Sequence, residues 1–252
     1  IRDRVNIPEA LDIIGQEVKP VNVAVLDTGS PYAVDPAFTR SIFDTQWGWD
    51  MVDNDALADD DEFPNGSFSH GTHVGSTISM LNDGLDGNGM AARVTPIRVC
   101  AGGCPGSATY GAYLYLNGDD NDSLTTFAQR SAGQKLHSVN MSYGGSGGSA
   151  TSASCVKLGE LADRGVLIAS SSGNSGIGSV GWPSSCPKVY SVGATNGTDR
   201  RSSYSSTNEY VAFSAPGGEY SDWNADGIDD LVYAYARDNS YVQSNNNGNP
   251  MI

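Results

Sequence analysis

Asn174 stands in a glycine-rich stretch, Gly-Asn-Ser-Gly at residues 173–176, that closely follows a short apolar run at residues 166–169. This pattern predicts a buried strand that ends at a site. The asparagine amide carries two N–H donors, and a donor held rigidly at a strand end can stabilise a developing oxyanion. An asparagine beside glycine is also typical of a turn. The stretch alone supports both interpretations.

Asp27 follows a second apolar run, at residues 23–26, and lies two residues before Gly29. The run is short and rich in β-branched residues, which predicts a central parallel strand. Sites in open α/β sheets form at the carboxyl ends of the strands. An aspartate after a strand can equally cap a helix, so its position alone does not assign it a catalytic role.

His70 and His73 stand three residues apart and precede a run of small and apolar residues. The spacing predicts a helix that begins at His70 and is buried along one face. A metal site is disfavoured because the His-Glu-x-x-His arrangement is absent and the pattern places no third ligand. Capping or core histidines are the alternative.

Length, composition and charge limit the class of protein. The 252 residues contain 31 glycines, no internal repeat and no low-complexity linker, so we expect one domain spanning residues 1–252 with many short connections. The net charge of −15 disfavours nucleic acid or an anionic membrane as a partner. No apolar run approaches the roughly 20 residues of a membrane span. We expect a monomer with no nucleic-acid and no membrane partner.

The four cysteines do not form a complete zinc-binding pattern. If all four are oxidised, three pairings are possible. We favour Cys100–Cys104 and Cys155–Cys186, which implies an oxidising compartment. Buried free thiols are the alternative.

Four segments, taken together, resemble the sequence motifs of subtilisin-like serine proteases. In chain order they are Val-Ala-Val-Leu-Asp-Thr-Gly at residues 23–29, His-Gly-Thr-His-Val at 70–74, Val-Asn-Met-Ser-Tyr-Gly-Gly at 139–145 and Ser-Gly-Asn-Ser-Gly at 172–176. The resemblance covers essentially the whole sequence. It implies a three-layer α/β subtilisin-like fold with a mostly parallel central sheet and helices on both faces.

The resemblance also implies catalytic roles for three residues. Asp27 would orient His70, His70 would act as general base and acid, and Asn174 would donate to the oxyanion. A serine nucleophile needs an imidazole to take its proton, and the imidazole needs a carboxylate to hold its tautomer. We therefore expect a secreted serine endopeptidase acting on polypeptide substrates.

The family's nucleophile motif, Gly-Thr-Ser-Met-Ala, does not occur in the sequence. The resemblance places it after Ala-Pro-Gly at residues 215–217, on a buried helix, with an inserted hairpin within residues 222–247. We expect the serine beyond residue 252, on a C-terminal continuation or fragment, and the 252 residues alone to be inactive. A non-catalytic relative that binds peptides or calcium is the alternative, and a metal-dependent hydrolase using His70 is a third hypothesis.

By the same resemblance, residues 142–145 and residues 169–173 form the two walls of the pocket for the residue before the scissile bond. Their small side chains leave room for a large apolar or aromatic substrate side chain. Residues 99–107 would pair with the substrate backbone, which suits broad specificity. The expected substrate-binding residues are Ser142, Tyr143, Gly144, Gly145, Ser171, Ser172, Gly173 and Gly181.

Calcium is the expected cofactor, as a structural ion, because carboxylate and amide oxygens suit a hard cation. The resemblance indicates one site in the loop after the histidine helix, and a second begins at Asp222 with the first half of an EF-hand-like pattern that lacks Glu at position 12. Solvated turns are the alternative. The expected ligands are Asp35, Asn82, Asp86, Asp222, Asn224 and Asp226.

Overall fold

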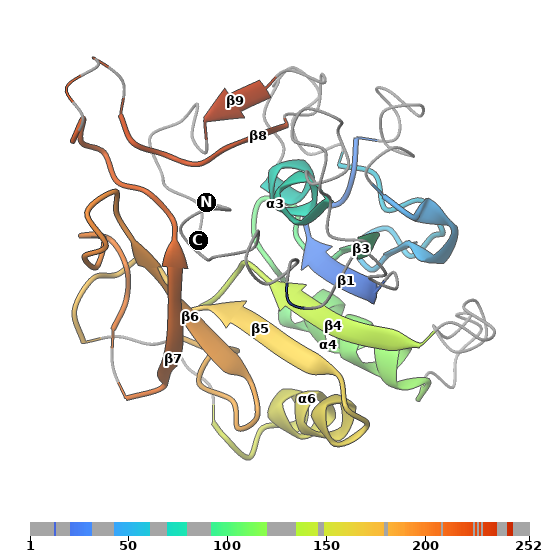
Figure 1. Cartoon of the computed structure of the whole chain (residues 1–252). Helices are drawn as coiled ribbons and strands as arrows, with labels where there is room; N and C mark the ends of the chain where they lie inside the picture. Colours follow the sequence, from blue (N-terminus) through green and yellow to red (C-terminus); the bar gives the residue numbers. More distant parts are fainter. Residues whose placement is uncertain are drawn as a thin grey trace.

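The computed structural model (Figure 1) forms one large and one small β-sheet with helices packed against the large sheet. It describes residues 13, 21–31, 43–60, 70–79, 92–119, 135–145, 149–178, 181–207, 209–223, 225, 227, 229–235 and 241–243.

The large sheet has seven strands in the order β2-β3-β1-β4-β5-β6-β7, and every neighbouring pair is parallel. The prediction of a mostly parallel sheet is therefore confirmed. Because β1 lies between β3 and β4, the chain leaves β1 toward one side of the sheet and later returns to the other. The strands are β1 Val21–Asp27, β2 Trp49–Asp50, β3 Ala92–Arg98, β4 Leu136–Met141, β5 Leu167–Ser171, β6 Tyr190–Thr195 and β7 Val211–Pro216.

Helices cover both faces of this sheet, as predicted. Figure 1 shows α3 on one side and α4 and α6 together on the other, which gives three layers. The elements are η2 Thr45–Trp47, a 3₁₀ turn, and the helices α3 His70–Ser79, α4 Gly106–Asn117 and α6 Ala153–Asp163.

Strand β1 supplies side chains to two hydrophobic cores, because successive residues of a strand point to opposite faces. Ala24 and Leu26 pack in the core that contains α4 and α6. Val23 and Val25 pack in the smaller core against Val74 of α3. Burial on both faces explains the continuous apolar run at residues 23–26.

Local signals set the ends of the helices. The Ser152 hydroxyl accepts from the Cys155 N–H at 3.3 Å and caps the start of α6. Gly118 has φ of 77° and ends α4 with its N–H on the carbonyls of Leu114 and Tyr115. Helix α3 begins at His70, as the spacing of the two histidines predicts.

Both favoured disulfides are present. Cys100–Cys104 closes the loop between β3 and α4, and Cys155–Cys186 ties α6 to the segment before β6. No cysteine is free.

The small sheet is an antiparallel pair of β8 Tyr233–Tyr235 and β9 Tyr241–Gln243. It falls within residues 222–247, where the sequence predicts a hairpin, and β8 packs against α3. None of the helices built from the described residues has the length and hydrophobicity needed to cross a bilayer.

Candidate active site

Asp27 and His70 form the centre of the candidate site. Asp27 is the last residue of β1 and His70 the first of α3, and the fold joins them across 43 residues with 2.6 Å between His70 Nδ1 and Asp27 Oδ1. The Asp27 side chain is 2% exposed and that of His70 is 31% exposed. A carboxylate against Nδ1 favours the tautomer with the proton on Nδ1, which leaves Nε2 able to accept one.

The backbone around Asp27 fixes its position. The Thr28 N–H donates to Asp27 Oδ1 at 2.7 Å. The Asp27 carbonyl accepts from Val99 N at 2.8 Å and from Cys100 N at 3.2 Å, so the loop after β3 is anchored to the same residue. The carboxylate therefore lies where β1 meets the disulfide-closed loop.

Two glycines allow α3 to approach the end of β1. A Cβ atom on Gly71 would lie 2.4 Å from the carbonyl oxygen and 2.9 Å from the nitrogen of Gly29. Gly29 itself has φ of 112°, a conformation that favours glycine. The backbones of the turn and of the first helical turn are thus in direct contact, which holds His70 beside Asp27.

The two predicted pocket walls extend from neighbouring strands, β4 and β5. Gly145 pairs with Trp182, each N–H donating to the other carbonyl at 3.0 Å. A Cβ on Gly181 would lie 2.6 Å from the Gly145 carbonyl oxygen, so glycine is needed there for this contact. The structure thus brings Gly181 against Gly145, and both Gly144 and Gly145 are exposed.

The side chains of two predicted wall residues point away from the walls. Ser172 is fully buried, and its hydroxyl donates to the Ser206 carbonyl at 2.9 Å. The Tyr143 hydroxyl lies 2.9 Å from that of Tyr113 in the core around α4. The side chains of Ser172 and Tyr143 thus anchor the two wall segments to the protein interior. Those of Ser142 and Ser171 line a pocket.

Tyr143 carries no charge beside Asp27. Burial raises the pKa of Tyr143 well above its usual value, and electrostatic coupling to Tyr113, the hydrogen bond with Tyr113 and the charge of Asp27 raise it further. Burial likewise raises the pKa of Tyr113. Both tyrosines therefore stay protonated, and the hydroxyl pair adds no negative charge beside the Asp27 carboxylate.

Asn174 is exposed and follows β5 at the carboxyl edge of the sheet, two strands from Asp27 in the strand order. Ser206 fixes the loop on both sides of it, donating its N–H to the Gly173 carbonyl at 2.8 Å and accepting from Ser175 N at 3.0 Å. The exposed Asn174 therefore lies at the same edge of the sheet as Asp27.

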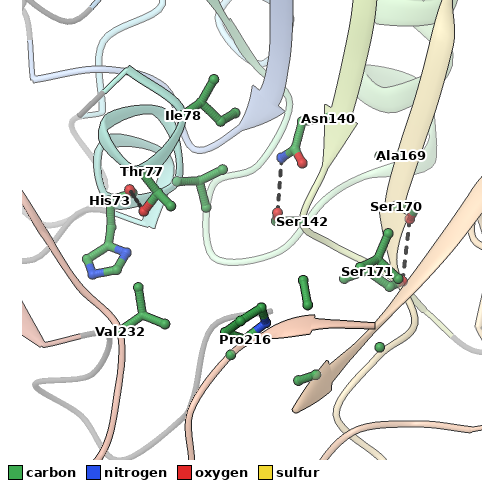
Figure 2. A pocket seen from close by; sticks show the side chains of 16 residues that line it. His73, Thr77, Ile78, Asn140, Ser142, Ala169, Ser170, Ser171, Pro216 and Val232 are labelled. Carbon is green, nitrogen blue, oxygen red and sulfur yellow. Dashed lines mark hydrogen bonds between the residues drawn. The ribbon is translucent and has the colours of Figure 1, made fainter. Parts of the chain in front are cut away.

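A pocket of about 250 Å³ lies between strands β4 to β7 and α3, the helix that begins at His70. Figure 2 shows Thr77 and Ile78 of α3 on one side, Ser142 and Ser171 on the other, and Pro216 closing the base. Most of its surface is apolar. The sequence did not indicate this pocket, because its lining comes from five separate elements.

Most of the predicted calcium ligands lie outside the described residues, namely Asp35, Asn82, Asp86, Asn224 and Asp226. Asp222 is described: it is exposed, and its Oδ2 accepts from the Gly227 N–H at 2.7 Å. Within the described part of the chain, no group of three or more His, Cys, Asp or Glu side chains is placed to hold a metal ion.

Comparison with known proteins gives consistent matches. The model of the subtilase family matches residues 19–248. Subtilisin Savinase of Lederbergia lenta is 31% identical over 200 residues, covering 78% of this chain and 64% of its own. Alkaline elastase YaB of Bacillus sp. (strain YaB) is 33% identical over 148 residues, covering 59% of this chain and 36% of its own.

Solved structures agree with these sequence matches. A cold-adapted subtilisin-like serine proteinase has a TM-score of 0.61 and 25% identity, covering 88% of this chain and 68% of its own. A protease of Pseudoalteromonas arctica PAMC 21717 has a TM-score of 0.66 and 26% identity, covering 89% and 72%. The chain spans between 36% and 64% of the length of the two relatives matched by sequence.

Replacing Gly71 by alanine tests the close contact between α3 and β1. The added Cβ meets backbone atoms of Gly29, which cannot yield as a flexible side chain can, so we expect a loss of about 1–3 kcal/mol in the free energy of unfolding, measured in urea. Gly159→Ala in α6 is the control, since a Cβ there would meet nothing within 4 Å. This substitution should raise the free energy of unfolding by up to about 1 kcal/mol, because alanine favours the helix more than glycine does. Equal stability of Gly71→Ala and the parent protein would contradict the contact.

Proposed function

The chain belongs to the subtilase family, and we propose that it is the aspartate- and histidine-bearing part of a serine endopeptidase that hydrolyses polypeptides. The observation that carries this proposal is the contact of 2.6 Å between His70 Nδ1 and the buried Asp27 carboxylate at the carboxyl edge of the sheet. A buried carboxylate that orients a partly exposed imidazole is the arrangement that activates a hydroxyl nucleophile.

In the proposed reaction, His70 Nε2 takes the proton of a serine hydroxyl as its oxygen attacks the scissile carbonyl. Asp27 holds the Nδ1–H and stabilises the resulting imidazolium. The Asn174 amide donates to the oxyanion of the tetrahedral intermediate. His70 then gives the proton to the leaving amine, and water, activated in the same way, releases the acyl group.

The nucleophile in this proposal comes from a segment that the 252 residues do not contain, since Gly-Thr-Ser-Met-Ala is absent from them. The greater length of the relatives is consistent with such a segment. The apolar pocket lined by His73 and Ile78 has room for apolar side chains of the segment that would carry the serine toward His70. Without this segment the chain should not turn over substrate.

For the substrate, we propose broad specificity with a large apolar side chain before the scissile bond. Gly144 and Gly145, which carry no side chains, are exposed on one wall, and Gly181 sits against Gly145. The two disulfides support a secreted location, because such bonds persist in oxidising compartments.

Structural calcium is also part of the proposal. Gly227 has φ of 89°, and its N–H binds the carboxylate of Asp222 five residues earlier, the closure expected of the first half of an EF-hand-like loop. The residue types in this loop fit calcium, with Asp222, Asn224 and Asp226 supplying oxygen ligands. Asp35, Asn82 and Asp86 would supply a second site.

A fluorophosphonate probe, which reacts with activated serines, tests the proposed activity. The complete gene product should be labelled, whereas His70→Ala and Asp27→Asn versions should lose labelling because the serine is no longer activated. The 252-residue chain alone should remain unlabelled. A complete product that folds and binds peptide but takes no label would instead indicate a non-catalytic relative.

Asn174→Ala tests the proposed oxyanion donor. In the complete enzyme kcat should fall by about a hundredfold or more with little change in KM, because the donor acts only as charge develops. Peptide-ester hydrolysis measures both constants. Ser175→Ala, which changes the neighbouring exposed side chain, should leave them unchanged. An unchanged kcat for Asn174→Ala would return this residue to a turn-forming role.

Removal of calcium should lower thermal stability. From a calcium concentration about 100 times Kd, chelation should cost about 2.7 kcal/mol in the free energy of unfolding per site. Differential scanning calorimetry should show a smaller calcium effect in Asp222→Ala than in the parent, and an unchanged effect in Glu209→Ala, which alters another exposed acid. A Tm that is independent of calcium in all three proteins would contradict the sites.

A further inference from the structure

The side chain of Thr28 connects the helix that carries His70 to a second buried carboxylate. Its Oγ1 accepts from the Gly71 N–H at 2.9 Å, at the start of α3. The same hydroxyl donates to Oδ2 of Asp60. Neither Thr28 nor Asp60 takes part in the proposed chemistry.

Asp60 is held firmly in this place. It is 1% exposed, and its N–H donates to the Ser30 carbonyl at 2.7 Å, while the Ser30 N–H donates to Ala58 O at 2.8 Å. The segment of residues 58–60 is thereby fastened to the turn that follows β1. A carboxylate buried to this degree requires hydrogen-bond donors, and the Thr28 hydroxyl is one of them.

The carboxylate of Asp60 determines how the Thr28 hydroxyl is oriented. A hydroxyl has a single proton, and an ionised carboxylate can only accept, so the proton of Thr28 points to Asp60. Its lone pairs are then directed to the Gly71 N–H. That amide is one of the first four of α3, which have no acceptor within the helix.

Thr28 therefore holds both members of the central pair. Its N–H donates to Asp27 Oδ1 at 2.7 Å, and its hydroxyl fixes the helical turn that begins at His70. These two bonds act together with the backbone contact of Gly71 with Gly29 on the distance between Asp27 and His70, because both bonds start from one residue.

We propose that Thr28 and Asp60 are positioning residues that set the geometry of the Asp27–His70 pair through the relay from Gly71 N–H to Thr28 to Asp60. The catalytic part of this inference rests on the proposed function. Thr28→Val keeps the shape of the side chain but removes the hydroxyl, so Gly71 N–H and Asp60 each lose a partner. Thr28→Ser keeps the relay.

The Nδ1–H proton of His70 reports on this geometry by NMR, since a proton held in a short hydrogen bond to a carboxylate is strongly deshielded and slow to exchange. In Thr28→Val we expect the resonance to move upfield and broaden, and kcat of the complete enzyme to fall about ten- to a hundredfold with KM little changed. Thr28→Ser should restore both. Asp60→Asn should give the same direction of change, because its amide no longer forces the hydroxyl proton toward it.

The matched control is Thr109→Val. Thr109 is fully buried, and its hydroxyl also bonds at the start of a helix, to Pro105 O at 3.3 Å and Gly106 O at 3.1 Å. This variant should lower Tm but leave the His70 resonance and kcat unchanged. Equal effects of Thr28→Val and Thr109→Val, or no effect of Thr28→Val, would overturn the relay.

The NMR measurement does not require a nucleophilic serine, so the two proposals can fail separately. A complete gene product that takes no fluorophosphonate label, yet shows the resonance and its loss in Thr28→Val, retains the relay and refutes the protease. A labelled enzyme whose Thr28→Val form matches the parent retains the protease and refutes the relay. Absence of the resonance in the parent protein would also refute the relay.

Discussion

The backbone contact between Gly71 and Gly29 is the constraint on which the candidate site depends. A side chain on Gly71 would overlap the Gly29 backbone, and Gly29 adopts a φ that favours glycine. Their contact lets a helix begin directly over the end of a central strand. The two backbones are then close enough for the side chains of His70 and Asp27 to meet. The imidazole stays partly exposed while the carboxylate is buried.

The sheet order explains why other functional elements gather at the same place. Strand β1 lies between β3 and β4, so the loops that follow these two strands begin beside the end of β1, where Asp27 lies. The loop after β3 is anchored on the Asp27 carbonyl through Cys100 N, and the wall after β4 is closed by the pairing of Gly145 with Trp182. Parallel strands carry all of these segments to one edge, which is where sites of open α/β sheets form.

Short-range patterns predicted the elements well and the buried polar contacts poorly. The apolar run at residues 23–26 corresponds to β1, where burial on both faces leaves a continuous apolar signal. The run at residues 166–169 overlaps β5, although Leu167 within it is 52% exposed. Asp60, by contrast, stands in a run of four acidic residues at positions 59–62, a pattern typical of a solvated loop. In the structure it is 1% exposed, and its N–H donates to the carbonyl of Ser30, 30 positions earlier in the chain. The direction of the Ser172 side chain likewise depends on Ser206, which no local pattern indicates.

Two buried carboxylates meet at Thr28, and their roles differ because the residue divides its two donors between them. Its N–H goes to Asp27 and its hydroxyl to Asp60. A buried carboxylate without such a donor would either take up a proton or keep its charge at a high energetic cost. The Thr28 hydroxyl is one donor to the Asp60 carboxylate, while Asp27 Oδ1 faces His70 Nδ1 and accepts the Thr28 N–H. A single threonine after the strand thus contacts both carboxylates, and in the proposed mechanism only Asp27 orients the base.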